Sequence, residues 1–369
     1  MRFEILATSR ISNARVGRII TPHGVVDTPG FVAVATNGAL KHIDFPTADA
    51  LGCQLVFCNT AHFLVNSGPD LVHKAGGLHE FLRRRNSPLI TDSSGFQVFS
   101  WGDLVKKVTT EDGITFRSYR DGSTIQVSPE TSIDAQVKLG ADIILVLDEL
   151  LGYENATHAV TLQSMTRSHV WAERSWKEFD RLKHTSKTEQ GLYGIVHGGF
   201  FPDLRQKSAE FLVENYPDFA GYALGGSLGV GPTQDEAKLA LTTGVSALPM
   251  HKPKHLLGIG DINSLRLAIP LGIDTFDSSF PTKLARHGTV VLGDGTYLTL
   301  KKSIYATEFN KPLDPTCPCE TCARYSLAYL HHLLKCHEPV LATLLCVHNL
   351  TQIHLMMAQA RQDITDGRL

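Results

Sequence analysis

The sequence has no long apolar run and no signal-peptide pattern. Its longest uninterrupted apolar stretch covers positions 143–147, whereas a membrane-spanning helix needs about 20 residues. The first residues, MRFEILATSR, contain no apolar core of the kind found in secretory leaders. We therefore expect a cytoplasmic protein that has no membrane partner.

An excess of charge of either sign is also missing. The 35 lysines and arginines nearly balance the 37 aspartates and glutamates, and the formal net charge is −2 at pH 7. Proteins that bind nucleic acid are usually basic, so the overall charge gives no indication of an RNA partner. A local excess of basic residues lies between positions 280 and 311, and a solvated surface is its simplest interpretation.

The seven cysteines do not suit a disulfide framework, because their number is odd and no secretory signal accompanies them. Three of them, Cys317, Cys319 and Cys322, lie within six residues. Thiolates this close can bind one metal ion, and a distant histidine can complete a Cys3His set, which forms structural zinc sites with no open position. The alternative is that the cysteines only pack as small apolar side chains, which seldom cluster in this way.

The fourth ligand could be His331, His332, His337 or His348. The adjacent pair looks like part of a helix that follows the third cysteine, and a single histidine beyond that helix can return the chain to the site. We therefore choose His348 and predict one structural zinc ion per chain.

Short runs of apolar, β-branched residues recur along the chain and alternate with helix candidates at 132–139, 160–183 and 202–215. Such runs suit strands that are buried on both faces of a parallel sheet. The alternation predicts an α/β fold, and the number of strands favours a closed (β/α)8 barrel over an open, doubly wound sheet. The runs are 31–36, 54–58, 88–91, 142–147, 192–196, 221–225, 254–259 and 273–276.

Polar residues and glycines follow these strands. In a parallel barrel all strand carboxyl ends open on one face, and that face carries the active site. An aspartate at the start of a helix is also a common N-cap, but three at equivalent strand ends indicate a shared pocket. The strand-end residues are Asn59, Asp92, Asp148, His197, Gly226, Gly260 and Asp277.

The barrel pattern ends near position 290. We expect a barrel domain at 1–290 and an inserted zinc-binding subdomain at 291–351. From Leu350 onward, apolar residues recur at a spacing of three and four, which predicts an amphipathic helix. Residues 352–369 are expected to pack against the barrel as a C-terminal helix.

A series of motifs, in order along nearly the whole chain, resembles the tRNA-guanine transglycosylase (queuine tRNA-ribosyltransferase) family, in its bacterial form. That resemblance implies a barrel with an inserted Cys3His subdomain and a homodimer. It implies an enzyme that exchanges the wobble guanine of tRNAs with a U-G-U anticodon context for a 7-deazaguanine base. The motifs are TDSSGFQVFS (91–100), LDE (147–149), GIVHGG (194–199), GYALGG (221–226), LLGIG (256–260), DTFDSSFPTKLARHG (274–288), CPCETC (317–322) and HN (348–349).

The resemblance also implies roles for individual residues. Asp277 matches the nucleophile that attacks the ribose anomeric carbon, as in a retaining glycosidase. Asp92 matches the carboxyl group that protonates the departing guanine and later deprotonates the incoming base. Asn59 matches an asparagine that forms hydrogen bonds near the nucleophile, and Lys283 and Arg286 match basic residues near the anticodon.

The remaining matched residues would hold the base. Asp148 can accept hydrogen bonds from N1–H and the exocyclic amine of guanine. Glu149 matches a residue near the same edge, and a backbone N–H at Gly226 can donate to O6. Phe96 would cover one face of the base, and Leu257 stands where bacterial members usually have methionine.

Five positions depart from the bacterial pattern: Ser94 replaces a glycine, His197 a glutamine and Leu150 a cysteine, Ser227 alters the segment after the glycine pair, and Leu257 replaces the methionine. His197 can still donate a hydrogen bond, with an altered pH dependence.

Position 229 is a glycine in this chain and in eukaryotic members, whereas bacterial members have a valine there. A missing valine side chain would leave room for a large base, so Leu150 and Gly229 favour queuine over its smaller aminomethyl precursor. Drift in a loop is the alternative interpretation of both positions.

Two other functions are conceivable. A non-catalytic tRNA-binding subunit of the same fold need not keep the catalytic carboxylates, whereas this chain has both Asp92 and Asp277. A metal-dependent barrel hydrolase would need ligands at strand ends, whereas the cysteine cluster follows the barrel. Both comparisons favour the enzyme with a structural metal.

Overall fold

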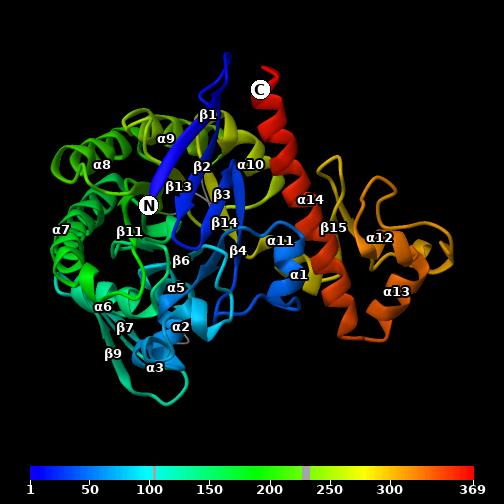
Figure 1. Ribbon diagram of the computed structural model, residues 1–369, viewed down its shortest axis with the longest axis horizontal. Helices are drawn as coiled ribbons and strands as arrows, with labels where there is room; N and C mark the ends of the chain where they lie inside the picture. Colours follow the sequence, from blue (N-terminus) through cyan, green and yellow to red (C-terminus); the bar gives the residue numbers. More distant parts are fainter. Residues whose placement is uncertain (103–104, 227–232) are drawn as a thin grey trace.

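Eight parallel strands form a closed barrel in the computed structural model, which describes residues 1–102, 105–226 and 233–369 (Figure 1). The strands follow one another in chain order, and the last closes the ring by pairing with the first, where Asp277 lies opposite Val32. The predicted (β/α)8 barrel and all eight predicted strands are confirmed. The strands are β4 (Gly30–Val34), β5 (Val56–Cys58), β6 (Leu89–Thr91), β10 (Ile143–Leu145), β11 (Gly191–Val196), β12 (Gly221–Leu224), β13 (Lys254–Leu256) and β14 (Thr275–Ser278).

Helices cover the outside of this ring, and the barrel strands are therefore buried on both faces. The three helices expected from the sequence are present with small shifts at their ends. Helix α6 begins with a capping box in which the Ser128 hydroxyl accepts the Thr131 N–H, and it ends at Gly140 with φ of 69°. The helices around the barrel are α1 (Phe45–Ala50), α2 (Thr60–Val65), α3 (Pro69–Lys74), α4 (Leu78–Phe81), α5 (Gly95–Ser100), α6 (Pro129–Leu139), α7 (His158–Leu182), α8 (Pro202–Asn215), α9 (Gln234–Ser246), α10 (Ile262–Ala268) and α11 (Phe280–Arg286).

Two antiparallel sheets of three strands each accompany the barrel and were not expected. The first, β1 (Arg2–Thr8), β2 (Arg15–Thr21) and β3 (Gly24–Thr28), precedes the first barrel strand. The second, β7 (Lys107–Thr110), β8 (Gly113–Arg117) and β9 (Thr124–Val127), lies in the connection between β6 and β10. Every side chain of β7 is exposed, so this sheet lacks the continuous apolar runs that identified the barrel strands.

Two histidines and an aspartate tie the end of the barrel opposite to the strand carboxyl ends. Asp142, fully buried just before β10, lies 2.8 Å from Nδ1 of His23 and 3.1 Å from Nε2 of His79. The two rings are stacked, with centroids 3.4 Å apart and planes 13° apart. A ring nitrogen directs its lone pair within the ring plane, so stacked rings do not converge on one ion. We interpret this group as a hydrogen-bonded clamp and not as a metal site.

The C-terminal part of the chain lies beside the barrel and contains β15 (Thr289–Val291), β16 (Tyr297–Thr299), α12 (Glu320–Arg324), α13 (Leu327–Lys335) and α14 (Val340–Thr365). Figure 1 shows α14 (red) between the barrel and the orange segment that holds α12 and α13. Helix α14 begins well before Leu350, so the expected boundary between 351 and 352 lies inside one helix.

Helix α14 also has the length and composition of a membrane-spanning segment, alone among the described helices. Its most apolar 18-residue window has a mean hydropathy of 1.4, and 56% of that window is buried inside the protein. It packs against α11 and against the barrel strand β4. A core helix of a soluble domain has these properties, so we assign α14 to packing.

Candidate active site and metal centre

The polar residues at the strand ends lie together at the carboxyl end of the barrel. Nδ2 of Asn59, after β5, donates to Oδ2 of Asp92, after β6, at 2.7 Å. Nε2 of His197, after β11, lies 3.0 Å from Oδ2 of Asp148, after β10. All four side chains are buried. Residues far apart in the sequence thus meet on one face, as the barrel interpretation predicts.

Asp92 is surrounded by hydrogen-bond donors and is almost completely buried. Besides the amide of Asn59, the backbone N–H of Thr60 donates to its Oδ1 at 2.7 Å, and the N–H of Ser94 also contacts the carboxylate. Burial raises the pKa of Asp92 to about 6, against the opposing effect of these donors, and the negative charge of Asp277 raises it further. A carboxyl group with this pKa can give up and recover a proton near neutral pH.

Asp277 occupies the end of β14 and is buried with one carboxylate oxygen held firmly. Its Oδ1 accepts the backbone N–H of Gly258 at 2.9 Å and lies 3.1 Å from Nε2 of His255. Among the described residues, no hydrogen-bond donor contacts Oδ2. The carboxylate is therefore oriented through one oxygen, while the other has a free lone pair.

Asp148 is held between the loops after β6 and β11. The hydroxyl of Ser93 donates to its Oδ1 at 3.1 Å, and His197 contacts Oδ2. Glycines allow the neighbouring loops to approach: a Cβ at Gly95 would lie 2.5 Å from the carbonyl oxygen of Asp148, and a Cβ at Gly225 would lie 3.6 Å from Oδ2. Only a residue without a side chain fits at position 95.

A buried arginine that the sequence analysis did not identify supports this side of the site. Arg205, on α8, donates to the carbonyl oxygens of Val196, Gly199, Gly225 and Gly226 at 2.6–3.1 Å. Its guanidinium joins the loops after β11 and β12, which carry His197 and Gly226. An arginine in an otherwise apolar stripe of a helix was the available signal.

The other expected base-binding residues differ in their surroundings. Phe96, at the start of α5, is 49% exposed, and Leu257 is half-buried beside Gly225. The carboxylate of Glu149 is not directed at Asp148, because it pairs with Arg167 on α7 at 2.6 Å. Gly229, together with Ser227, lies outside the described residues.

The two basic residues expected near RNA, Lys283 and Arg286, are both exposed on α11, the helix that follows Asp277. They therefore lie in a segment directly connected to the candidate nucleophile.

Ser94 has an unusual backbone conformation. It replaces the second glycine of the family motif and adopts φ of 86°, in the left-handed region. This conformation disfavours a residue with a Cβ. The hydroxyl oxygen of Ser94 is buried and has no hydrogen-bond partner among the described residues.

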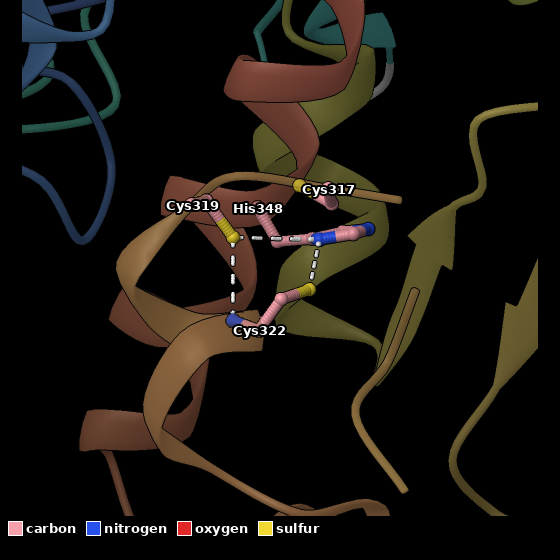
Figure 2. Close-up of side chains that lie close together, drawn as sticks. All are labelled: Cys317, Cys319, Cys322 and His348. Atoms are coloured by element: carbon pink, nitrogen blue, oxygen red, sulfur yellow. Dashed lines mark hydrogen bonds between the residues drawn. The ribbon is translucent and has the colours of Figure 1, made fainter. Parts of the chain in front are cut away.

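The four expected metal ligands form one cluster beside α14 (Figure 2). Nδ1 of His348 lies 3.2 Å from Sγ of Cys322 and 3.7 Å from Sγ of Cys319, and Cys317 completes the group. Nε2 of His348 lies 2.8 Å from the carbonyl oxygen of Val291. A hydrogen on Nε2 donates to that carbonyl and leaves the Nδ1 lone pair facing the thiols, which is the arrangement found in metal-binding histidines.

The rival histidines, His331, His332 and His337, lie outside this cluster. Nδ1 of His331 lies 2.6 Å from the carbonyl oxygen of Leu300, and His332 is exposed on α13 beside Cys336. The choice of His348 is thus confirmed as a member of the cluster. A set of three thiols and one imidazole suits a four-coordinate ion.

Comparison with known proteins agrees with the resemblance that the motifs carry. The family profile described as queuine tRNA-ribosyltransferase matches residues 10–369. A queuine tRNA-ribosyltransferase of Protochlamydia amoebophila (strain UWE25) is 46% identical over 382 residues, which cover 99% of this chain and 95% of that protein. Those of Chlamydia abortus and Chlamydia muridarum are 43% and 42% identical, and each alignment covers 100% of both chains. The chain therefore belongs to the queuine tRNA-ribosyltransferase family of transglycosylase enzymes.

Proposed function

We propose that this enzyme replaces guanine at the wobble position of tRNA by a 7-deazaguanine base, through a covalent intermediate on Asp277. One observation carries the proposal: two buried aspartates at the same barrel end have different surroundings. Asp277 is oriented through Oδ1 alone, and Asp92 has a pKa of about 6. One carboxylate suits attack and the other suits proton transfer.

In the first half-reaction, Oδ2 of Asp277 forms a bond to the ribose anomeric carbon while the bond from that carbon to guanine breaks. The electron pair of the broken bond leaves with guanine, which receives a proton from Asp92. In the second half-reaction, Asp92 removes a proton from the incoming base, which attacks the same carbon and releases Asp277. Asn59 and the Thr60 N–H keep Asp92 in place through both steps.

Asp148 is the proposed anchor for the base. Each carboxylate oxygen has two lone pairs, so Oδ1 and Oδ2 can accept the guanine N1–H and amine while keeping Ser93 and His197. We place Phe96 and Leu257 against the faces of the ring and the Gly226 N–H near O6. Glu149 is assigned a supporting role, because its carboxylate is engaged by Arg167.

The proposed tRNA has a U-G-U anticodon context, with Lys283 and Arg286 near its phosphates. Both side chains are exposed on the helix after the nucleophile. A local basic patch is sufficient for one RNA loop even though the whole chain has a net charge of −2. The wobble base would leave the anticodon stack to reach the barrel, as in other enzymes that act on bases.

The proposed incoming base is queuine, with the aminomethyl precursor as the alternative. Two residues of the sequence, Leu150 and Gly229, support queuine. A glycine at 229 leaves room that a smaller base would not fill. Purified enzyme supplied with both bases in competition would decide between them, since a much higher kcat/KM for the precursor would contradict the queuine assignment.

We further propose that the Cys317, Cys319, Cys322 and His348 cluster holds a structural zinc ion. The ion would join the loop before α12 to α14, and all four ligand positions belong to the protein, so no open position is available for chemistry. We propose 1–290 as the catalytic unit and the segment from 291 as the zinc-binding subdomain. A cytoplasmic homodimer is the proposed working form, by analogy with the family.

A non-catalytic tRNA-binding subunit is the alternative function. The Asp277→Asn variant separates the two functions, because it keeps the shape of the side chain and removes its nucleophilic charge. We expect exchange of labelled guanine into tRNA to fall by roughly 1000-fold or more, with tRNA affinity preserved. Near-normal exchange by the variant would contradict the mechanism, and absence of exchange by the unaltered enzyme would favour the non-catalytic subunit.

A further inference from the structure

A fully buried histidine lies directly behind the proposed nucleophile. His255, in β13, places Nε2 at 3.1 Å from Oδ1 of Asp277 and Nδ1 at 2.8 Å from the hydroxyl oxygen of Thr275. Both partners belong to the neighbouring strand β14, and His255 pairs with Thr275 in the sheet register. The ring of Phe57, in β5, is nearly parallel to the imidazole, with centroids 6.1 Å apart and planes 14° apart. Both ring nitrogens of His255 therefore contact the same neighbouring strand, β14.

The partners determine where the ring hydrogens lie. A carboxylate only accepts hydrogen bonds, so Nε2 of His255 must carry a hydrogen to bond to Asp277. The Thr275 hydroxyl can donate to Nδ1, and a neutral imidazole then satisfies both contacts. The Thr275 hydroxyl donates to Nδ1 of His255, and Nε2–H of His255 donates to Oδ1 of Asp277. The last hydrogen bond of this series is therefore accepted by the proposed nucleophile.

We propose that His255 is a positioning residue for the transglycosylation, and that it selects Oδ2 of Asp277 as the attacking oxygen. His255 and the Gly258 N–H both bind Oδ1, from β13 and from the loop that follows it. Two donors on one oxygen fix the rotation of the carboxylate and reduce the electron density available on Oδ1. Oδ2, which has no donor among the described residues, keeps its lone pair for the anomeric carbon.

This inference rests on the proposed role of Asp277, but it concerns the orientation of that side chain and not its identity. Attack requires a near-linear approach to the anomeric carbon within a narrow range of angles. Loss of one hydrogen bond to a charged group, with some loss of alignment, lowers a rate by about 10- to 100-fold. The effect should fall on kcat, because tRNA and base binding involve other residues.

Two amide substitutions of His255 separate its contact with Asp277 from its contact with Thr275. In His255→Gln, the amide nitrogen reaches the position of Nε2 and can donate to Asp277. In His255→Asn, the shorter side chain reaches only the position of Nδ1 and keeps the contact with Thr275. His79→Gln, in the clamp at the other end of the barrel, serves as a control for loss of stability alone.

The measurement is guanine exchange into tRNA, with kcat and KM for tRNA, and the rate at which the covalent tRNA–protein complex forms on a denaturing gel. We expect His255→Gln to stay within several-fold of the unaltered enzyme. His255→Asn should lose about 10- to 100-fold in kcat and in covalent complex formation, with KM unchanged. His79→Gln should lose thermal stability without this loss in kcat.

Equal kcat values for the Gln and Asn variants would overturn the positioning role, as would a loss in kcat that simply follows the melting temperature across all three variants. Asp277→Asn keeps this outcome separate from failure of the proposed function. If that variant is inactive and His255→Asn is normal, only the positioning role is wrong. If Asp277→Asn remains active, the proposed mechanism itself is wrong.

Discussion

His197 binds Asp148 through Nε2, which lies 3.0 Å from Oδ2. The carboxylate accepts, so Nε2 carries the hydrogen, and Nδ1 lies toward Gly226, 3.3 Å from where a Cβ of that glycine would be. A neutral His197 then has a lone pair, and no hydrogen, on Nδ1. In this form the ring can donate only to Asp148.

The first prediction follows from that pair. His197→Gln places a side-chain amide where it can donate one hydrogen to Asp148 and the other to the base. We expect kcat/KM for guanine in the exchange assay to rise by about 3- to 10-fold in the variant, which corresponds to one additional neutral hydrogen bond. An unchanged or lower kcat/KM in the variant would contradict this role of His197.

The second prediction concerns the stability effect of Asp92. Burial raises its folded-state pKa from 3.8 to about 6, so the folded protein favours the protonated form. Both states are protonated at low pH and no penalty arises there. As the pH rises from about 4 to 6, the unfolded chain ionises first, and the folded state loses stability. Asp92→Asn removes this loss and should stabilise the protein by up to about 3 kcal/mol at pH 7.5, and by much less at pH 4.

Urea unfolding of both proteins at the two pH values measures this difference. The same variant should lose exchange activity, because an amide cannot shuttle the proton. If the variant and the unaltered protein differ in stability by the same amount at pH 4 and at pH 7.5, then the surroundings of Asp92 do not raise its pKa.

The third prediction concerns the metal cluster. Cys319→Ser should lower the free energy of unfolding by about 3 kcal/mol or more, because binding of a structural zinc ion contributes directly to folding. Elemental analysis should find about one zinc per chain in the unaltered protein and much less in the variant. Cys336→Ser is the matched control, since Cys336 is exposed and outside the cluster. A metal-free protein that is folded and equally stable would refute the structural role.

The fourth prediction concerns Ser94. Its φ of 86° disfavours any residue with a Cβ, by about 1–2 kcal/mol. Ser94→Gly removes this strain and the unpartnered buried hydroxyl, although glycine increases the entropy of the unfolded chain. We expect a net stabilisation of about 1 kcal/mol, measured by chemical denaturation. Ser93→Gly, which removes a hydroxyl bonded to Asp148, should destabilise instead, and a similar loss in both variants would contradict the strain argument.

The order and composition of the apolar runs in the sequence were sufficient to predict the barrel. The eight strands lie in short apolar runs that are buried on both faces. Such a run can be recognised from adjacent residues in the sequence. The four residues of the candidate metal cluster could also be identified from the sequence, because three of them lie within six residues and the fourth follows one helix. The strand-end aspartates could be grouped because parallel strands place their carboxyl ends on one face.

Only the tertiary structure determined how these residues contact one another. The contacts of His255 with Asp277 and of Arg205 with four carbonyl oxygens depend on strand register and on helix placement, which no local pattern encodes. The sheet of β7, β8 and β9 was missed because its strands are short and β7 is exposed throughout, so it lacks a continuous apolar run. Helix α14 begins at Val340; α11 and β4 pack on one part of it and α12 and α13 on another, and such tertiary packing stabilises a helix beyond what its own sequence pattern predicts.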